Sequence, residues 1–332
     1  MSLHQRAPWL AASVFGLACI TGGLPHHVIA AETYPLRPVR IIVAYAPGGG
    51  SDQLARLVAP RLTQEFGQQF IVDNRPGGNT LIAMQLLAAA PADGYTLGVI
   101  DTAFAINPSL MHKLPYDSAR SFAPVTLLAT SPFVLVVHPS LAAKNMAELV
   151  ALARAKPGQL SFSSAGPGTG TRIASDQFGK AAGIRILQIP YKGGSPSAAA
   201  LIGGEVHASF ATLPLMYTQI SAGRARALAV TGPQRYAQLP EVPTLAEAGY
   251  REVTASGFWG VVTPAGVPQT ILNRLNQAMG RYLQTAELRE ALAQRHFEGG
   301  QSGMSAAEFG GFLRTELARW EKSVRETGAK LE

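Results

Sequence analysis

A triple glycine stands between an apolar run and a helix-like segment near the start of the chain, in residues 47–52 (PGGGSD). Glycine lets backbone N–H groups come close to a ligand, and the first turn of a helix adds unpaired N–H groups and partial positive charge. We expect Ser51 or Asp52 to cap the helix that follows. The segment is a candidate anion site, although a tight turn with an N-cap and no ligand would have the same sequence.

The spacing of these glycines argues against a nucleotide as the anion. Counted from Gly48, the dinucleotide-binding pattern G-x-G-x-x-G requires a glycine at position 53, where the chain has Gln53. The lysine of a P-loop is missing, and the acidic Asp52 would repel a polyphosphate. A small carboxylate, or an amino acid whose ammonium group meets Asp52, suits this loop better.

A second glycine-rich loop, residues 163–171 (SSAGPGTGT), also lies between a strand-like and a helix-like segment. The hydroxyls of Ser164, Thr169 and Thr171, together with exposed amides, would form a neutral polar nest that suits a carboxylate. Arg172 follows directly and either adds positive charge to the site or lies in solvent as an ordinary helix residue.

Two more glycine loops repeat the theme, at residues 75–80 (RPGGNT) and 191–196 (YKGGSP). Asn79 or Thr80 would be the N-cap of the next helix. One such loop is weak support for a binding site, but four at strand-to-helix junctions favour one.

Catalytic motifs do not stand out. The chain has no G-x-S-x-G elbow, no H-E-x-x-H and no paired-histidine metal spacing. The histidines beyond residue 30 are isolated from one another, at His112, His138, His207 and His296. We predict a binding protein without cofactor or metal; an exported α/β enzyme whose Ser/His/Asp set assembles from distant residues is the alternative.

Composition favours a large folded protein that meets anions. The 332 residues are 47% hydrophobic and 15% charged, which supports a large core and is enough chain for two domains. The formal net charge of +7 favours anionic partners. No Lys/Arg run and no alternation of aromatic and basic residues indicates nucleic acid.

The first thirty residues are typical of a signal peptide. Arg6 precedes an apolar stretch at residues 9–20, and small residues lead to Ala30. The stretch is shorter than the ~20 apolar residues of a membrane span. We therefore predict cleavage after residue 30 and export to the periplasm. The only cysteine, Cys19, lies in this segment, in a context that does not favour lipidation.

Two series of strands and helices follow. Residues 39–45, 70–72 and 95–100 read as strands with helices between them, which argues for a mostly parallel sheet covered by helices. A second series begins after the apolar residues 132–137 with a helix capped by a box at Asn145. Its strands are expected at residues 160–163, 184–189, 206–210 and 227–230.

The chain is expected to return to its first unit near the end. Residues 258–262 read as a fresh strand, and Ser305 starts a capping box for a last helix. We predict a first domain of residues 31–130 plus 253–332 and a second of residues 131–252. Two crossings would then form a hinge, with a ligand cleft at the carboxyl ends of the strands.

The ordered motifs from about Tyr34 to the C-terminus resemble a known family. They include VRIIVAYAPGGGSDQLARLVA, PADGYTLGV, SFSSAGPGTGTRIASDQF and IPYKGGSPSAAALIGGEVHASF. The sequence is similar to the Bug-type solute-binding receptors of tripartite tricarboxylate transporters. This resemblance implies an α/β, type II periplasmic binding-protein fold of the Venus-flytrap kind. It also implies a monomer that captures a small carboxylate, such as an organic acid or acidic amino acid, and delivers it to membrane permease subunits.

The resemblance also implies the ligand-binding residues. They are Gly48, Gly49, Gly50, Ser51, Asp52, Gly78, Asn79, Thr80, Thr102, Ala103, Ser164, Ala165, Gly166, Thr169, Gly170 and Thr212. The chain departs from the family in a shorter loop at residues 75–83 and at Arg172, which leaves open the solute and any contact from Arg172 or Lys192. A periplasmic sensor that docks on a membrane signalling protein is a second alternative.

Overall fold

A computed structural model describes residues 34–111 and 113–330 of the chain. The predicted signal peptide at residues 1–30, with Cys19, and also His112 lie outside the described residues. The described residues belong to one compact unit. None of their helices is both long enough and apolar enough to cross a membrane.

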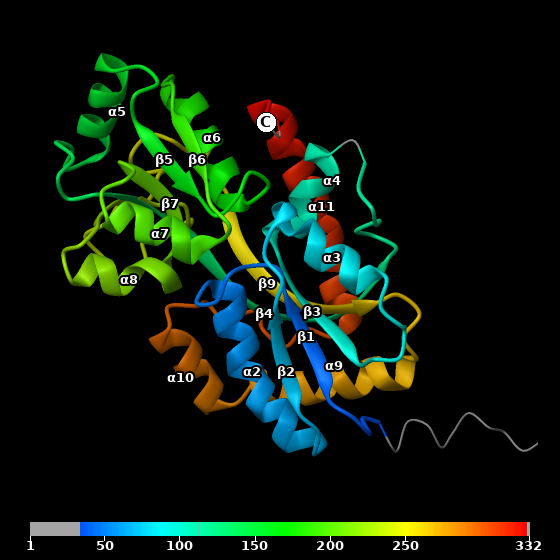
Figure 1. Ribbon diagram of the computed structural model, residues 1–332. Helices are drawn as coiled ribbons and strands as arrows, with labels where there is room; N and C mark the ends of the chain where they lie inside the picture. The colour runs from blue at the N-terminus through cyan, green and yellow to red at the C-terminus, as the bar shows by residue number, and fades with distance from the viewer. Residues whose placement is uncertain (1–33, 112, 331–332) are drawn as a thin grey trace, which may run out of the picture. The chain divides into compact units, whose positions relative to one another are not determined.

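The first part of the sheet consists of three parallel strands in the order β2-β1-β3. The central strand, β1, reads Val-Arg-Ile-Ile-Val and is almost fully buried, as expected for a parallel strand covered on both faces. Helices α2 and α3 connect the three strands (Figure 1). The bounds are β1 Val39–Val43, α2 Gly50–Phe66, β2 Phe70–Asn74, a 3-10 turn Gly78–Thr80, α3 Leu81–Ala88 and β3 Thr96–Asp101.

The second part repeats this arrangement, with parallel strands in the order β7-β5-β6 and α8 leading on to β8. Each expected strand is present within a few residues of its predicted place. The bounds are α5 Met146–Ala155, β5 Ser161–Ser164, α6 Gly170–Ala182, β6 Leu187–Pro190, α7 Gly194–Ile202, β7 Ala208–Thr212, α8 Leu213–Ser221 and β8 Arg226–Val230.

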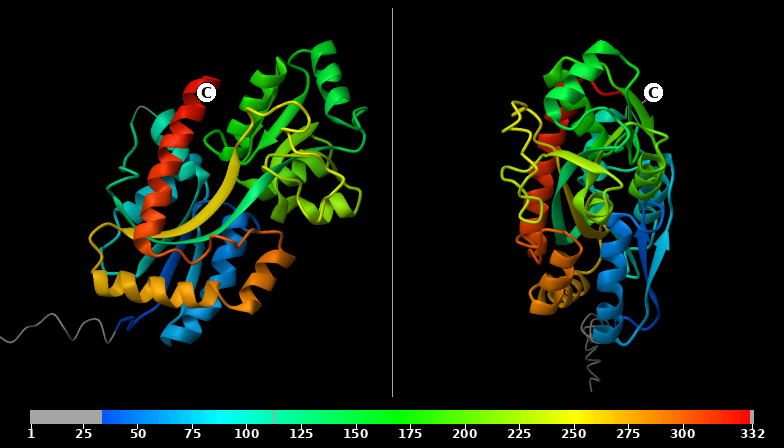
Figure 2. Two further views of the ribbon diagram at one scale, coloured as in Figure 1. Left: turned by 180° about the vertical axis from the view of Figure 1, so that it is seen from behind. Right: turned by 90° about the vertical axis from the view of Figure 1, so that its left-hand side faces the viewer.

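Two long strands join the parts, β4 (Phe122–Val137) and β9 (Ser256–Pro264). Residues 122–132 of β4 pair with β9, and residues 133–137 pair with β7 and β8. All these pairings, and that of β9 with β3, are antiparallel. The expected mostly parallel sheet is therefore wrong for its middle, and Figure 2 shows β4 and β9 running side by side between the two sets of parallel strands.

The C-terminal helices return to the first part of the sheet, as α9 (Gln269–Leu283), α10 (Ala286–Gln294) and α11 (Ala306–Thr327). The predicted capping box at Ser305 is confirmed, with reciprocal hydrogen bonds to Glu308. α11 buries Trp320 and packs against β4, α6 and α4 (Thr102–Leu110), a helix that the sequence did not predict.

The cap of α5 differs from its prediction in one detail. The Asn145 side chain accepts from the Glu148 N–H, as a capping box requires. The Glu148 carboxylate, however, accepts from the N–H of Lys144, one residue before the cap. The chain therefore enters this helix with only half of the box formed.

Candidate functional site

A cavity of about 60 Å³ lies where the carboxyl ends of β1, β3, β5 and β7 meet, between the two parts of the sheet. The starts of α2, α4, α6, α7 and α8 all contribute to its wall. Ligands of open α/β folds bind at the carboxyl ends of strands, where loops and helix N-termini converge. This position makes the cavity the candidate binding site.

Five aromatic rings also line the cavity. The rings come from the end of β1, from β4, from β7 and from β9. They belong to Tyr45, Phe133, Phe210, Phe258 and Trp259. Among the described residues, no Lys, Arg or His side chain lines the cavity. An anion bound here would therefore depend on N–H and O–H donors.

The start of α2 supplies such donors. Its N-cap is Gly49, with no side-chain cap, so the expected capping by Ser51 or Asp52 is wrong. The first helical hydrogen bond runs from the Gln53 N–H to the Gly49 carbonyl. Within the described residues the N–H groups of Gly50 and Ser51 have no acceptor, and both residues line the cavity.

Trp259 adds a third donor beside them. A Cβ built on Gly50 would come within 2.6 Å of the Trp259 ring and 3.3 Å of its Nε1. The indole N–H therefore lies next to the start of α2, and it donates to no group of the described chain. Gly50 is required here because any larger residue would displace this ring.

Asp52 does not line the cavity. Its buried carboxylate accepts hydrogen bonds from the Gly48 N–H at 2.9 Å, from Asn74 Nδ2 at 2.9 Å and from Arg56 at 3.0 Å. Burial opposes its ionisation, but the bonds from Arg56, Gly48 and Asn74 together lower the pKa of Asp52. The carboxylate thus holds the glycine turn against β2.

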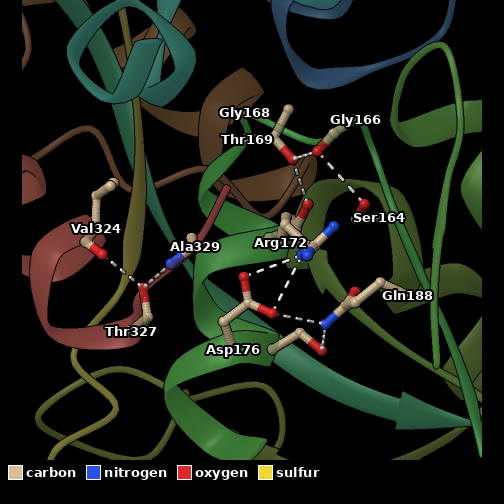
Figure 3. Close-up of polar contacts among 12 residues, drawn as sticks. Ser164, Gly166, Gly168, Thr169, Arg172, Asp176, Gln188, Val324, Thr327 and Ala329 are labelled. Carbon is tan, nitrogen blue, oxygen red and sulfur yellow. Dashed lines mark hydrogen bonds and ion pairs between the residues drawn. The ribbon is translucent and has the colours of Figure 1, made fainter. Parts of the chain in front are cut away.

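In the second glycine loop, side-chain hydroxyls donate hydrogen bonds to a carbonyl of the same loop. Thr169 Oγ1 donates to the Gly166 carbonyl at 2.7 Å, and Ser164 Oγ lies 3.4 Å from the same oxygen (Figure 3). The Gly170 N–H donates to Thr102 Oγ1 at 3.1 Å, which ties the start of α6 to the start of α4. The expected nest is present, but much of its hydrogen-bonding capacity is already used.

Arg172 lies away from the cavity. Its guanidinium pairs with Asp176 one helical turn later, at 3.0 Å, and both side chains are largely buried. Gln188 donates to the same Asp176 carboxylate (Figure 3). Arg172 therefore stabilises α6 against β6.

The loop at residues 77–80 also has partners within the protein. Asn79 Oδ1 accepts from the Gly168 N–H at 2.9 Å, and its Nδ2 donates to Asn107 Oδ1 at 2.6 Å. Asn107 donates in turn to Thr80 Oγ1. Asn79 and Thr80 both have positive φ, at 52° and 72°, a conformation that few residues other than glycine adopt. The loop at residues 77–80 is thus hydrogen-bonded to the second glycine loop and holds it in place.

Half of the sixteen predicted ligand-binding residues line the cavity, and the others lie elsewhere. Those that line the cavity are Gly49, Gly50, Ser51, Thr102, Ala165, Thr169, Gly170 and Thr212. Gly78, Asn79, Thr80 and Gly166 line a neighbouring hollow that also includes Lys192 and shares Tyr45 and Ala165 with the cavity. Gly48, Asp52, Ala103 and Ser164 line neither.

Sequence reasoning missed Asp101, which is the N-cap of α4 and lines the cavity. Its Oδ1 accepts from the Ala103 N–H and from the Tyr45 hydroxyl, each at 3.0 Å. No described group donates to its Oδ2. Burial raises the pKa of Asp101 to about 6. An Asp-Thr pair directly after a strand is a helix-start signal that could have located it.

The aromatic wall was missed for a different reason. Phe133, Phe258 and Trp259 stand in apolar strands and are buried. In the sequence they cannot be told from residues of the hydrophobic core.

Comparison with known families decides what kind of protein this is. The sequence profile of the tripartite tricarboxylate transporter family receptors (TctC) matches residues 54–329. The chain belongs to this family. The receptor is 36% identical over 323 residues to the protein BugT of Bordetella pertussis, covering 96% of this chain and 98% of that one.

Solved structures agree. The receptor is similar to the R. palustris protein Rpa4515, solved with adipate, with a TM-score of 0.86 and 33% identity over 90% of this chain and all of that one. MatC of Rhodopseudomonas palustris, solved with bound malate, gives a TM-score of 0.84 and 25% identity over 88% of this chain and all of that one. The fold is the type II binding-protein fold.

Proposed function

We propose that this protein is a periplasmic receptor that captures one small carboxylate in the cavity and delivers it to a tripartite tricarboxylate-type membrane transporter. The observation that carries the proposal is the set of unpaired donors at the start of α2. The N–H groups of Gly50 and Ser51 and the indole N–H of Trp259 lie together on a cavity wall, and no described residue competes for them as an acceptor. A carboxylate has two oxygens that accept from such donors, and the helix dipole favours its charge.

Capture would follow when the first predicted domain, residues 31–130 plus 253–332, closes on the second, residues 131–252. The hydrogen bonds Gly168–Asn79 and Gly170–Thr102 connect these two sets of residues. Closure requires a ligand that prefers the closed form, since equal affinity for both forms shifts no population. A carboxylate held by the start of α2 that also contacts residues 131–252 across the cavity would have that preference. The net charge of +7 would help to gather anions before closure.

The ligands of related proteins support a carboxylate as the solute. Rpa4515 was solved with adipate and MatC with malate, and both are carboxylates. The predicted signal peptide would place the receptor in the periplasm, where such a receptor meets its solute.

A thermal-shift screen of ligand-free protein against small carboxylates tests the proposal. At least one should raise the melting temperature, because a ligand that binds only the folded state stabilises it. Trp259→Phe keeps an aromatic ring but removes the N–H donor, and should weaken the binding of that ligand about tenfold. A flat response to a broad panel, with the protein shown to be ligand-free by mass spectrometry, would contradict the proposal.

A further inference from the structure

The cavity that we propose for a carboxylate contains a carboxylate of its own. Asp101 lines it, its Oδ1 is held by the Tyr45 hydroxyl and the Ala103 N–H, and its Oδ2 accepts from no described group. A ligand that carries only negative charge would be repelled by this residue at close range. No basic side chain lines the cavity within the described residues to offset that repulsion.

The surroundings of Asp101 suit a cation instead. Tyr45, Phe133, Phe258 and Trp259 line the same cavity. The faces of aromatic rings attract cationic nitrogen, and a carboxylate among aromatic rings strengthens that attraction. The donors for an anion, at the start of α2 beside Trp259, line the same cavity, and Trp259 stands opposite Asp101 in the pairing of β3 with β9.

We propose that the ligand is a compact zwitterion: its carboxylate binds the start of α2, and a cationic nitrogen pairs with Asp101 Oδ2. The inference rests on the proposed function, and it narrows the solute to a carboxylate with an ammonium or quaternary-ammonium group and an apolar body. Asp101 is then the residue that sets specificity. The sequence suggested Asp52 for this role, but the oxygens of Asp52 are occupied by Gly48, Arg56 and Asn74.

Matched pairs of ligands isolate the cation. Betaine and tert-butylacetate have the same shape, and only betaine carries a positive charge; γ-aminobutyrate and pentanoate form a second pair. Isothermal titration of ligand-free protein with a series of such pairs should show binding of at least one zwitterion about tenfold or more tighter than its counterpart, in which carbon replaces the cationic nitrogen.

Asp101→Asn tests the residue. Asparagine still caps α4, so the variant should fold, which its melting curve checks. The preference for the zwitterion should fall about tenfold or more, because the charge on its partner is gone. Asp117→Asn is the matched control: Asp117 also accepts from backbone N–H groups, at Ala119 and Arg120, but lies outside the cavity, and its variant should keep the preference.

The outcomes separate the two proposals. If the plain carboxylates bind as tightly as the zwitterions, or if Asp101→Asn binds the zwitterions as tightly as the native protein does, the inference is overturned while the carboxylate receptor stands. If neither member of any pair binds, and the wider carboxylate screen is also flat, the proposed function itself fails.

Discussion

Two glycine turns of this receptor look alike in the sequence and differ in the structure. The turn at residues 48–52 leaves the N–H groups of Gly50 and Ser51 unpaired on the wall of the cavity. The turn at residues 77–80 instead contributes Asn79 to a closed set of hydrogen bonds with Asn107 and Gly168. The same chemistry can thus serve a ligand or the protein, and what decides is whether a protein group already occupies the donors and acceptors.

The largest expected effect concerns the charge in the cavity. Burial raises the pKa of Asp101 from 3.8 to about 6. Between these values the folded chain keeps a proton that the unfolded chain has lost, so the free energy of unfolding falls as pH rises through this window. Asp101→Asn should remove the penalty and stabilise the ligand-free protein by up to about 3 kcal/mol near neutral pH.

Urea unfolding near neutral pH and at about pH 3 measures this effect, since the advantage of the variant should nearly vanish where Asp101 is largely protonated in both states. The Tyr45 hydroxyl faces the same carboxyl, but burial raises the pKa of Tyr45 well above 10, so it stays neutral throughout. An equal effect at both pH values would show that Asp101 is not destabilised by burial of its charge.

A substitution in the loop at residues 77–80 should lower the free energy of unfolding, whereas Asp101→Asn should raise it. Asn79→Ala removes the acceptor of the Gly168 N–H and the donor to Asn107, and should lower the free energy of unfolding by about 2 kcal/mol. Asn273→Ala is the control, because the hydrogen bond that Asn273 accepts from Gln269 is exposed. Loss of ligand binding without loss of stability would show instead that Asn79 contacts the ligand.

A smaller effect should follow at the start of α2. In Gly50→Ala the new Cβ would lie 2.6 Å from Trp259, so the ring must shift into the cavity. Affinity for the solute should fall about tenfold, as overpacking by one methyl group predicts. Titration calorimetry measures it. Gly311→Ala on α11, where the Cβ meets only the end of Arg314, should bind normally.

The smallest effect is expected at Arg172. Its pairing with Asp176 lies outside the cavity, so Arg172→Ala should leave affinity unchanged and lower stability by about 1 kcal/mol. A marked loss of affinity at unchanged stability would place Arg172 at the ligand.

Local sequence predicted most elements of this fold but not how they combine. Apolar runs and caps such as Ser305 located strands and helices to within a few residues, because they depend on neighbours in the chain. The antiparallel passage of β4 and β9 was missed, since it pairs residues 122–132 with a strand more than a hundred positions later. Such a pairing leaves no local pattern.

The site divides in the same way. Gly50, Ser51 and Gly170 could be predicted because a strand, a glycine turn and a helix follow one another in the chain. Trp259 reaches the cavity only through tertiary structure. Whether a polar group remains free for a ligand depends on partners such as Arg56 or Asn107, which the sequence does not place.

A crystal structure of the receptor with its best-binding carboxylate tests the central claim most directly. Ligand oxygens should lie about 3 Å from the N–H groups of Gly50 and Ser51, inside the cavity. A ligand seated instead in the hollow between Asn79 and Lys192, with the start of α2 facing only solvent, would contradict it.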